Sequence, residues 1–297
     1  MEVNNQLILT VLCTSYNQVD YIRECLEGIV MQQCSFKWEA IVHDDASIDG
    51  TQDVIREYAA KYPDIIKPIL QQENQFSKKD GSLRNILMNA CKGKYIANLE
   101  GDDYWTDPLK LQKQVEYLEN HPECGLVRTN YNRYYQTTKK MEKGVFEGTQ
   151  YISDTLQYYL LYAPFAGPCT WVYRTEIDKE RVLLPTKKYF NGDLTILLET
   201  CRLSSIKYME DNTAVYRIQE NSVSHVSPVR AIDFLNRLKN TRLLYAKREP
   251  IKFKLILWYG ICRSYRYRYI DAGIYRKWFY MCVRDFIELF FIPNRYF

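Results

Sequence analysis

The stretch Tyr95-Ile96-Ala97-Asn98-Leu99-Glu100-Gly101-Asp102-Asp103 is an apolar run that ends abruptly in acidic residues. An apolar run of this length is typical of a strand that is buried in a sheet. Three carboxylates around one glycine repel each other at a strand end unless a cation or a donor-rich ligand compensates them. The usual compensator is a divalent metal that carries phosphate, so this cluster is the first candidate site.

The chain around this stretch alternates between strand and helix patterns. Strands are predicted at 7–13, 38–43, 65–70 and 95–99, and helices at 21–32, 52–61 and 82–91. Alternation of this kind predicts an α/β sheet with its ligand site beyond the carboxyl ends of the strands. The polar loops 14–17, 44–51 and 100–105 fall at those ends, so we expect them to converge on one crevice.

The remainder of the chain changes character twice. A helix is predicted at 110–120, strands at 125–127, at 131–135 and within 165–173, and a helix from Gly192-Asp193 to Cys201. From about residue 228 the pattern changes to long helices rich in Arg, Lys, Tyr and Trp. We therefore predict a catalytic domain over 1–227, with halves of about 1–105 and 106–227, and a helical extension over 228–297.

Composition narrows the class of protein. The 297 residues are 46% hydrophobic and 26% charged, which is enough for at least one large core. The net charge of +4 does not indicate a nucleic-acid binder. Nine single cysteines without metal-ligand spacing, and the lack of a recognisable signal peptide, favour the cytoplasm. No apolar run is long enough to span a bilayer, which leaves peripheral contact with the inner face of the cell membrane open.

Four motifs in this order resemble the family 2 glycosyltransferases, of the type that builds bacterial cell-surface polysaccharides. They are Thr14-Ser15-Tyr16-Asn17, the run 44–51, Gly93-Lys94-Tyr95-Ile96-Ala97 leading into 100–103, and Gly192-Asp193. The resemblance covers about 7–225. It implies the GT-A fold, a Rossmann-like, mixed, mostly parallel sheet flanked by helices. It also implies inverting transfer of a sugar from a nucleoside diphosphate, with UDP as the expected nucleotide.

The resemblance assigns separate roles within the acidic cluster. It makes Asp103 the metal ligand of a DxD-type motif, and it places Asp102 against the ribose and sugar of the donor. Mg²⁺ or Mn²⁺ is the expected cofactor, because such ions commonly take one or two protein carboxylates and leave other positions to water and diphosphate. Glu100 stands where relatives usually have Asp. The alternative is that Asp102 and Asp103 only cap a turn or a helix before Pro108.

The second polar loop supplies the candidate base-binding carboxylates. The resemblance gives Asp44, or alternatively Asp45, the task of accepting the imide N–H of uracil. The alternative for this loop is structural, because Asp49 or Thr51 could cap the helix that follows.

Three more residues complete the predicted nucleotide site. Thr14 and Tyr16 follow the first strand, where the family's loop contacts the nucleotide, although Tyr16 could instead pack in the core. The guanidinium of Arg84 matches the geometry of phosphate oxygens and could pair with the diphosphate, unless it is simply solvated.

Asp193 is the predicted catalytic base. Inverting transfer needs a group that takes the proton from the attacking acceptor hydroxyl, and a partly desolvated carboxylate can do so. A helix cap is the alternative for Asp193.

A further segment concerns the metal. In relatives a His often stands at the position of Gln219, and an amide is a poorer metal ligand than an imidazole. His225 is either a substitute for that His or an exposed loop residue.

The C-terminal extension interleaves aromatic and basic residues, which suits the headgroup layer of an anionic bilayer. A helical cap on the catalytic domain or a dimer contact would also explain it.

The expected partners are therefore a nucleotide-sugar donor, a glycan or lipid-linked acceptor and a membrane surface, without nucleic acid. A non-catalytic module that binds nucleotide or glycan is the alternative function. A nucleotidyltransferase is disfavoured, because no Gly-rich phosphate loop follows the first strand.

Overall fold

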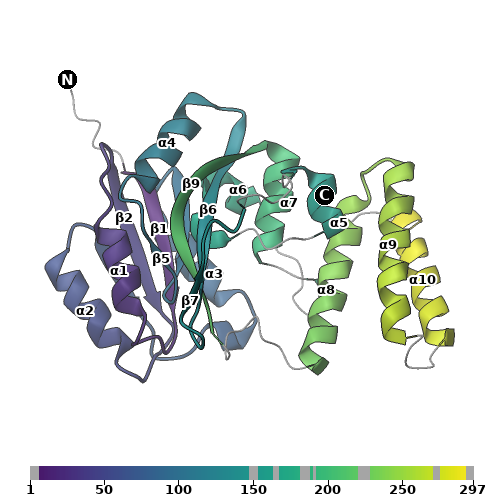
Figure 1. The fold of residues 1–297 in the computed structure, drawn as a ribbon, viewed down its shortest axis with the longest axis horizontal. Coiled ribbons are helices and arrows are strands. Elements are labelled where there is room, and N and C mark those ends of the chain that lie inside the picture. The colour runs from purple at the N-terminus through teal and green to yellow at the C-terminus, as the bar shows by residue number, and fades with distance from the viewer. Residues whose placement is uncertain are drawn as a thin grey trace. The chain divides into compact units, whose positions relative to one another are not determined.

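The computed structural model describes residues 7–146, 153–162, 167–180, 188–189, 192–219, 228–269 and 275–291. The chain forms two compact units (Figure 1). The first comprises Met1–Ile152, Ala166–Glu180 and Leu203–His225, and the second comprises Ser153–Phe165, Arg181–Arg202 and Val226–Phe297.

The first unit contains the predicted alternating series. It runs β1 (Leu7–Ser15), α1 (Ile22–Val30), β2 (Lys37–Asp44), α2 (Thr51–Lys61), β3 (Ile66–Leu70), the 3₁₀ turn η1 (Phe76–Lys78), α3 (Ser82–Ala90), β4 (Tyr95–Glu100) and β5 (Tyr104–Trp105). There follow α4 (Lys110–Asn120), β6 (Cys124–Tyr135), β7 (Lys140–Glu142), the 3₁₀ turn η2 (Pro168–Thr170), β8 (Val172–Arg174), α6 (Thr175–Glu180) and β9 (Ser205–Ile218).

These strands form one mixed sheet in the order β3-β2-β1-β4-β8-β6-β9-β5, with β7 paired to β6. The strands β3, β2, β1 and β4 are parallel neighbours. Their register sets Ser15 beside Asp44 and Thr14 beside Glu100. The predicted convergence of the three polar loops at one edge of the sheet is therefore confirmed.

Burial explains why the first elements form as predicted. In α1 the side chains of Ile22, Cys25, Leu26 and Ile29 are buried at helical spacing, so one apolar stripe faces the sheet. In β1 both faces are covered, since Leu9, Val11 and Cys13 are fully buried and Thr10 on the opposite face is buried as well.

Two strands differ from the prediction. The segments 125–127 and 131–135 belong to one continuous strand, β6, and the fourteen-residue β9 was not predicted as a strand. The first half of β9 is polar and largely exposed, so it lacks the buried apolar alternation by which a strand is recognised.

The second unit is helical. It contains α5 (Leu156–Tyr162), α7 (Asp193–Leu203, whose last residue belongs to the first unit), α8 (Pro228–Ala246), α9 (Ile251–Tyr269) and α10 (Tyr275–Phe290). Helices α9 and α10 lie side by side (Figure 1), joined by a hydrogen bond from Trp258 Nε1 to the carbonyl of Cys282 at 2.8 Å. The predicted long helices after residue 228 are confirmed. In the described part of the chain, every helix is too short or too polar to cross a bilayer.

Two helical glycines provide a matched test of the packing between α1 and β5. A methyl group on Gly28 would lie 2.7 Å from the backbone nitrogen of Trp105, whereas one on Gly260 would meet no atom within 4 Å. Alanine is favoured over glycine in a helix by about 1 kcal/mol. Gly260→Ala should therefore raise the free energy of unfolding by about 0.5–1 kcal/mol, and Gly28→Ala should lower it by about 1–3 kcal/mol. Thermal unfolding of both variants checks this, and equal stabilisation by both would contradict the close contact.

Candidate functional site

The loop after β1 and the loop after β2 are fastened to each other by hydrogen bonds. Backbone N–H groups of the first loop donate to side chains of the second: Asn17 to Ser47 Oγ at 2.8 Å, Gln18 to Thr51 Oγ1 at 2.9 Å, and Val19 to Asp49 Oδ2 at 3.0 Å. Asp49 also accepts the backbone N–H of Thr51, the first residue of α2, which agrees with the alternative that Asp49 caps this helix. Both loops are therefore held in one arrangement at the edge of the sheet.

The acidic loop after β4 joins this arrangement through Gly101. Its N–H donates to the carbonyl of Thr14 at 2.8 Å. A methyl group at position 101 would lie 2.5 Å from Gln18 Oε1 and 3.0 Å from the Cβ of Ser15. A side chain at position 101 would therefore have to displace the end of the Gln18 side chain.

Asp102 and Asp103 occupy different environments. Asp103 is 3% exposed, while Asp102 is only partly buried. Burial raises the pKa of Asp103 well above its usual range, and the negative charges of Asp102 and Glu100 raise it further. Burial also raises the pKa of Asp102, against the opposing effects of the Arg217 charge and the amides of Gln219 and Gln18. Both carboxylates are therefore harder to ionise than a free aspartate.

Arg217, near the end of β9, holds the acidic loop from the opposite side. Its backbone N–H donates to Asp103 Oδ1 at 2.8 Å, and its Nε donates to the carbonyl of Asp102 at 2.9 Å. Its Nη1 donates to Gln136 Oε1 at 2.9 Å, and its Nη2 pairs with Glu24 on α1. The guanidinium also lies within 5.5 Å of three tyrosine ring centroids, those of Tyr21, Tyr104 and Tyr134. One side chain therefore connects β9, α1, β6 and the acidic loop.

Gln219 follows on the same strand end. Its Nε2 donates to Asp102 Oδ2 at 2.8 Å, so the amide lies against the partly accessible carboxylate of the loop. His225 lies outside the described residues.

A divalent metal fits this loop as a site that a ligand would complete. Among the described residues, no three acidic, Cys or His side chains converge on one point as a closed cage. Mg²⁺ and Mn²⁺ do not require such a cage, because phosphate oxygens and water commonly supply most of their ligands. A cation beside Asp102 and Asp103 would favour their ionised forms, which burial disfavours.

Asp44 and Asp45 are buried and already hydrogen-bonded within the chain. Asp44 accepts from Ser15 Oγ at 3.0 Å, from the N–H and Oγ of Ser47 at 2.9 and 2.5 Å, and from Gln52 Nε2 at 2.8 Å. Asp45 accepts the N–H groups of Gln75 and Phe76 at 2.7 and 3.0 Å. Both carboxylates therefore shape the loops around the crevice, and their contact with uracil stays a prediction.

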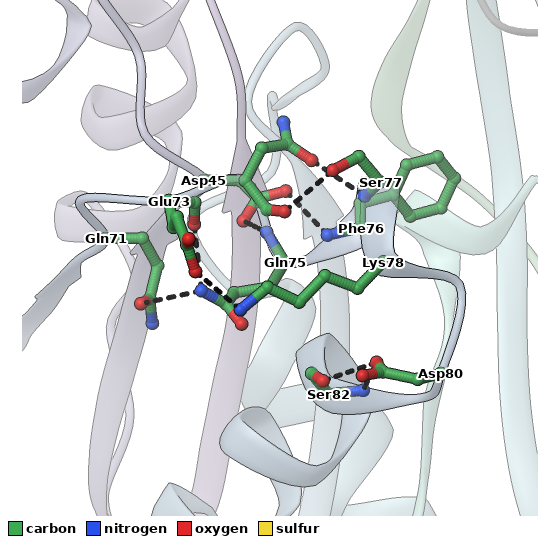
Figure 2. A network of polar contacts seen from close by, with 10 residues as sticks. Asp45, Gln71, Glu73, Gln75, Phe76, Ser77, Lys78, Asp80 and Ser82 are labelled. Atoms are coloured by element: carbon green, nitrogen blue, oxygen red, sulfur yellow. Dashed lines mark hydrogen bonds and ion pairs between the residues drawn. The ribbon is translucent and has the colours of Figure 1, made fainter.

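The segment 71–82 is ordered by the contacts of Asp45 and by its own polar side chains (Figure 2). Lys78 pairs with Glu73 at 2.7 Å, and Asp80 accepts the N–H of Ser82 at 2.9 Å at the start of α3. The Asp45 contacts fasten this segment to the end of β2, beside the two loops described above.

The remaining predicted nucleotide contacts have different surroundings. Thr14 is partly buried in β1 beside Glu100, and Tyr16 is 50% exposed, so the alternative that Tyr16 packs in the core is wrong. Arg84 is bound to Asp178, with Nη2 3.0 Å from Oδ1, so it is not simply solvated. Its pairing with a diphosphate stays a prediction.

Asp193 is exposed at the first residue of α7, in the second unit. An acidic residue in the first turn is favourable for a helix, as the capping alternative requires. Its role as the base stays a prediction.

A buried polar network supports the acidic loop from below. Trp105 Nε1 donates to the carbonyl of Cys169 at 2.7 Å. The thiol of Cys169 lies against Asp103, where its hydrogen bond favours the ionised carboxylate. Lys110 lies 4.8 Å from the Trp105 ring and donates to Gln114 Oε1 at 2.6 Å.

Sequence reasoning did not assign roles to Gln18, Glu24, Gln136 and Cys169. No local pattern marks them, because their partners lie on other elements. Arg217 comes shortly after buried residues of β9, and a charged residue in such a place was the available sign of a functional contact. Gln219 follows at the end of the same strand.

The fold is that of the GT-A glycosyltransferases. S. aureus TarS in complex with UDP-GlcNAc matches with a TM-score of 0.56 at 16% sequence identity, over 88% of this chain and 81% of that chain. The mannosyltransferase PcManGT from Pyrobaculum calidifontis, in complex with GDP-Man and Mn²⁺, matches with a TM-score of 0.57 at 19% identity, over 86% of this chain and 69% of that chain.

Residues 10–182 match the Glycosyl transferase family 2 domain, and the chain belongs to that family. The putative teichuronic acid biosynthesis glycosyltransferase TuaG of Bacillus subtilis is 27% identical, over 84% of this chain and 92% of its own length. The Escherichia coli UDP-Glc:alpha-D-GlcNAc-diphosphoundecaprenol beta-1,3-glucosyltransferase WfaP is 30% identical, over 47% and 51%. An uncharacterized protein of Mycobacterium tuberculosis is 50% identical over 39% of this chain, and the matched part spans about a third (32%) of that relative's length.

Removing the Arg217 guanidinium should loosen the acidic loop. We expect Arg217→Met to lower the free energy of unfolding by about 1–3 kcal/mol, because it removes three side-chain hydrogen bonds at a buried position. Arg217→Lys should recover only part of this, since an ammonium cannot reproduce the fork geometry. Denaturant titration measures both effects.

The matched control is Arg23→Met, because Arg23 forms an exposed ion pair with Glu57 from the same helix that carries Glu24. It should change stability little, since exposed pairs contribute little. Equal effects of Arg23→Met and Arg217→Met would contradict the bridging role of Arg217.

The buried amine of Lys110 predicts a pH dependence of stability. Burial lowers the pKa of Lys110 from 10.5 to about 7. Between these values the unfolded chain binds a proton that the folded chain does not, so the contribution of Lys110 to the free energy of unfolding rises with pH. In Lys110→Met this rise should be missing. Denaturation midpoints of both proteins at several pH values across this window check it, and parallel curves would contradict the lowered pKa.

Proposed function

We propose that this protein is an inverting glycosyltransferase that moves a sugar from a UDP-sugar to a hydroxyl of a glycan or lipid-linked acceptor. The observation that carries the proposal is the acidic loop at the end of β4, where burial raises the pKa values of Asp102 and Asp103 and where the strand end converges with those of β1 and β2. Membership of glycosyltransferase family 2 and the names of TuaG and WfaP support the reaction class. The UDP-GlcNAc bound by TarS supports the choice of nucleotide.

The nucleotide would lie across the ends of β1 and β2. The exposed ring of Tyr16 offers a stacking surface for the base, and Thr14 lies where β1 meets the acidic loop. Asp44 and Asp45 would act on uracil from a crevice that their own hydrogen bonds hold in shape. Arg84 would have to exchange its contact with Asp178 to reach a diphosphate.

A divalent metal, when bound, would neutralise the charge that develops on the leaving diphosphate. We assign its direct contact to Asp102, because this carboxylate is the more accessible of the pair and Gln219 can release it by turning its amide. Asp103, which the family resemblance favoured as ligand, is held inward by the N–H of Arg217 and would support the loop's charge. The Mn²⁺ of PcManGT supports the use of such an ion.

Asp193 would be the base that accepts the proton from the acceptor hydroxyl. An exposed carboxylate at a helix start is accessible to an acceptor hydroxyl and could take its proton. A reducing, cytoplasmic location at the inner face of the membrane would give the protein access to nucleotide sugars and lipid-linked acceptors.

The assignment of the metal is tested by paired variants. Asp102→Asn should raise the metal concentration needed for UDP-sugar turnover by about tenfold or more, because it removes a direct ligand. Asp103→Asn should act more through stability of the loop, as measured by unfolding. Release of UDP from a panel of nucleotide sugars, with and without chelator, gives the readout. Activity that is independent of metal in the unmodified protein would overturn the assignment.

The catalytic proposal is tested separately by Asp193→Asn. Loss of the base should lower transfer by about 10²–10⁴-fold while calorimetry shows unchanged UDP affinity. Full transfer activity of both Asp193→Asn and Asp103→Ala would refute the site. Tight UDP binding without sugar release from any donor would favour the alternative, a non-catalytic binding module.

A further inference from the structure

The second unit carries apolar side chains on a face that nothing in the described chain covers. On α9 they are Ile251, Leu255, Ile256 and Tyr259, and on or directly after α10 they are Phe279, Tyr280, Val283, Ile287 and Phe291, and together we call them the outer face. Their exposed fractions range from 40% for Val283 to 71% for Phe291. Of the 17 large hydrophobic residues that are exposed in the described parts of the chain, these nine come from two helices.

Both helices also have a buried apolar face, so the outer face is a second one. Phe253, Leu257 and Ile261 of α9 are buried, as are Cys282 and Leu289 of α10. Trp258 and Phe286 meet edge to face between the helices, with ring centroids 5.2 Å apart. A second, exposed apolar stripe on a helix that is already packed on one side marks a surface for interaction with a partner or a membrane.

The spacing makes the outer face continuous along each helix. Ile251, Leu255 and Tyr259 follow one another at four-residue intervals, and Val283, Ile287 and Phe291 do the same. Because positions i and i+4 lie on the same side of a helix, each set forms a stripe along its axis. The two helices lie side by side (Figure 1), which suits contact with a broad surface.

Charge identifies the kind of surface. Residues 251–290 include eight Lys or Arg and only three Asp or Glu, while the whole chain has a net charge of +4. Among the described side chains of both helices, Lys252, Arg263 and Arg284 are exposed, whereas Asp285 is buried against Lys239 and Glu288 pairs with Lys188 and Lys247. The outer face therefore combines exposed apolar side chains with exposed cations on the same two helices.

We propose that the outer face docks α9 and α10 on an anionic lipid bilayer, with the two helices lying in the headgroup layer. Apolar and aromatic side chains enter the boundary between headgroups and acyl chains, and the cations meet lipid phosphates. A second copy of this chain is the less suitable occupant, because two segments with the same excess of positive charge repel each other. The docking goes beyond glycosyl transfer and does not depend on it.

Vesicle flotation of the full chain tests the docking. The protein should float with vesicles of phosphatidylcholine mixed with phosphatidylglycerol and should largely stay behind with phosphatidylcholine alone. High salt should release it, because the screening length falls to about 3 Å at 1 M. Failure to float with anionic vesicles, or equal binding to neutral ones, would overturn the proposal.

A matched pair of variants distinguishes docking through the outer face from nonspecific adsorption to vesicles. Leu255 and Leu203 are 43% and 44% exposed, each on a helix. Leu255→Glu should lower partitioning into anionic vesicles by about tenfold or more, because it removes apolar contact and adds a repelled charge. Leu203→Glu should leave partitioning unchanged. Equal partitioning of both variants would overturn the proposal.

Two further measurements distinguish a lipid bilayer from a second copy of this chain as the binding partner. They also distinguish a failure of the docking proposal from a failure of the proposed transfer reaction. Lys252→Glu should weaken binding to anionic vesicles by roughly tenfold without an effect on neutral ones. In sedimentation without lipid, the unmodified protein should show no self-association through the outer face. Self-association that Leu255→Glu abolishes would assign the outer face to a second copy of this chain and overturn the proposal. UDP affinity should be the same in all variants, so a failure of docking would leave the proposed transfer reaction intact.

Discussion

Concentrated negative charge is the constraint on which the first unit depends, because parallel strand ends bring four aspartates and a glutamate to one edge of the sheet. The chain meets it in two ways. Asp44 and Asp45 receive donors from the adjacent loops and become parts of the framework. Asp102 and Asp103 receive donors from Gln219, Gln18, Arg217 and Cys169, yet burial keeps their pKa values raised. Asp44 and Asp45 are thus structural, whereas Asp102 and Asp103 are the candidates for binding a cation.

The sequence was sufficient for the first half of the fold, for physical reasons. Apolar runs such as 7–13 and 95–99 bury both faces of a strand, and the parallel arrangement then brings the loops after them together without further information. The sequence was insufficient for β9, whose first half is polar and exposed. It was also insufficient for Arg217, since a bond to Asp103 across 114 positions leaves no local pattern.

The candidate site was predictable as a place and only partly as a set of roles. The acidic cluster was located from charge alone, yet the contacts that distinguish Asp103 from Asp102, such as the N–H of Arg217 bound to Asp103, come from a strand far away in the sequence. Tyr16 shows the same limit, because an aromatic residue after a strand is compatible with either core or surface until the loop is placed. Asp193 depends on family resemblance, since it belongs to the second unit.

The close approach at Gly101 has a consequence for how this protein can change. A methyl group at position 101 would overlap Gln18 Oε1, so an alanine there would displace the end of the Gln18 side chain. Gln18 in turn reaches the Asp102 carboxylate, so shortening it removes a donor from the acidic loop. A side chain at position 101 would therefore act on the Asp102 carboxylate through the displaced amide of Gln18.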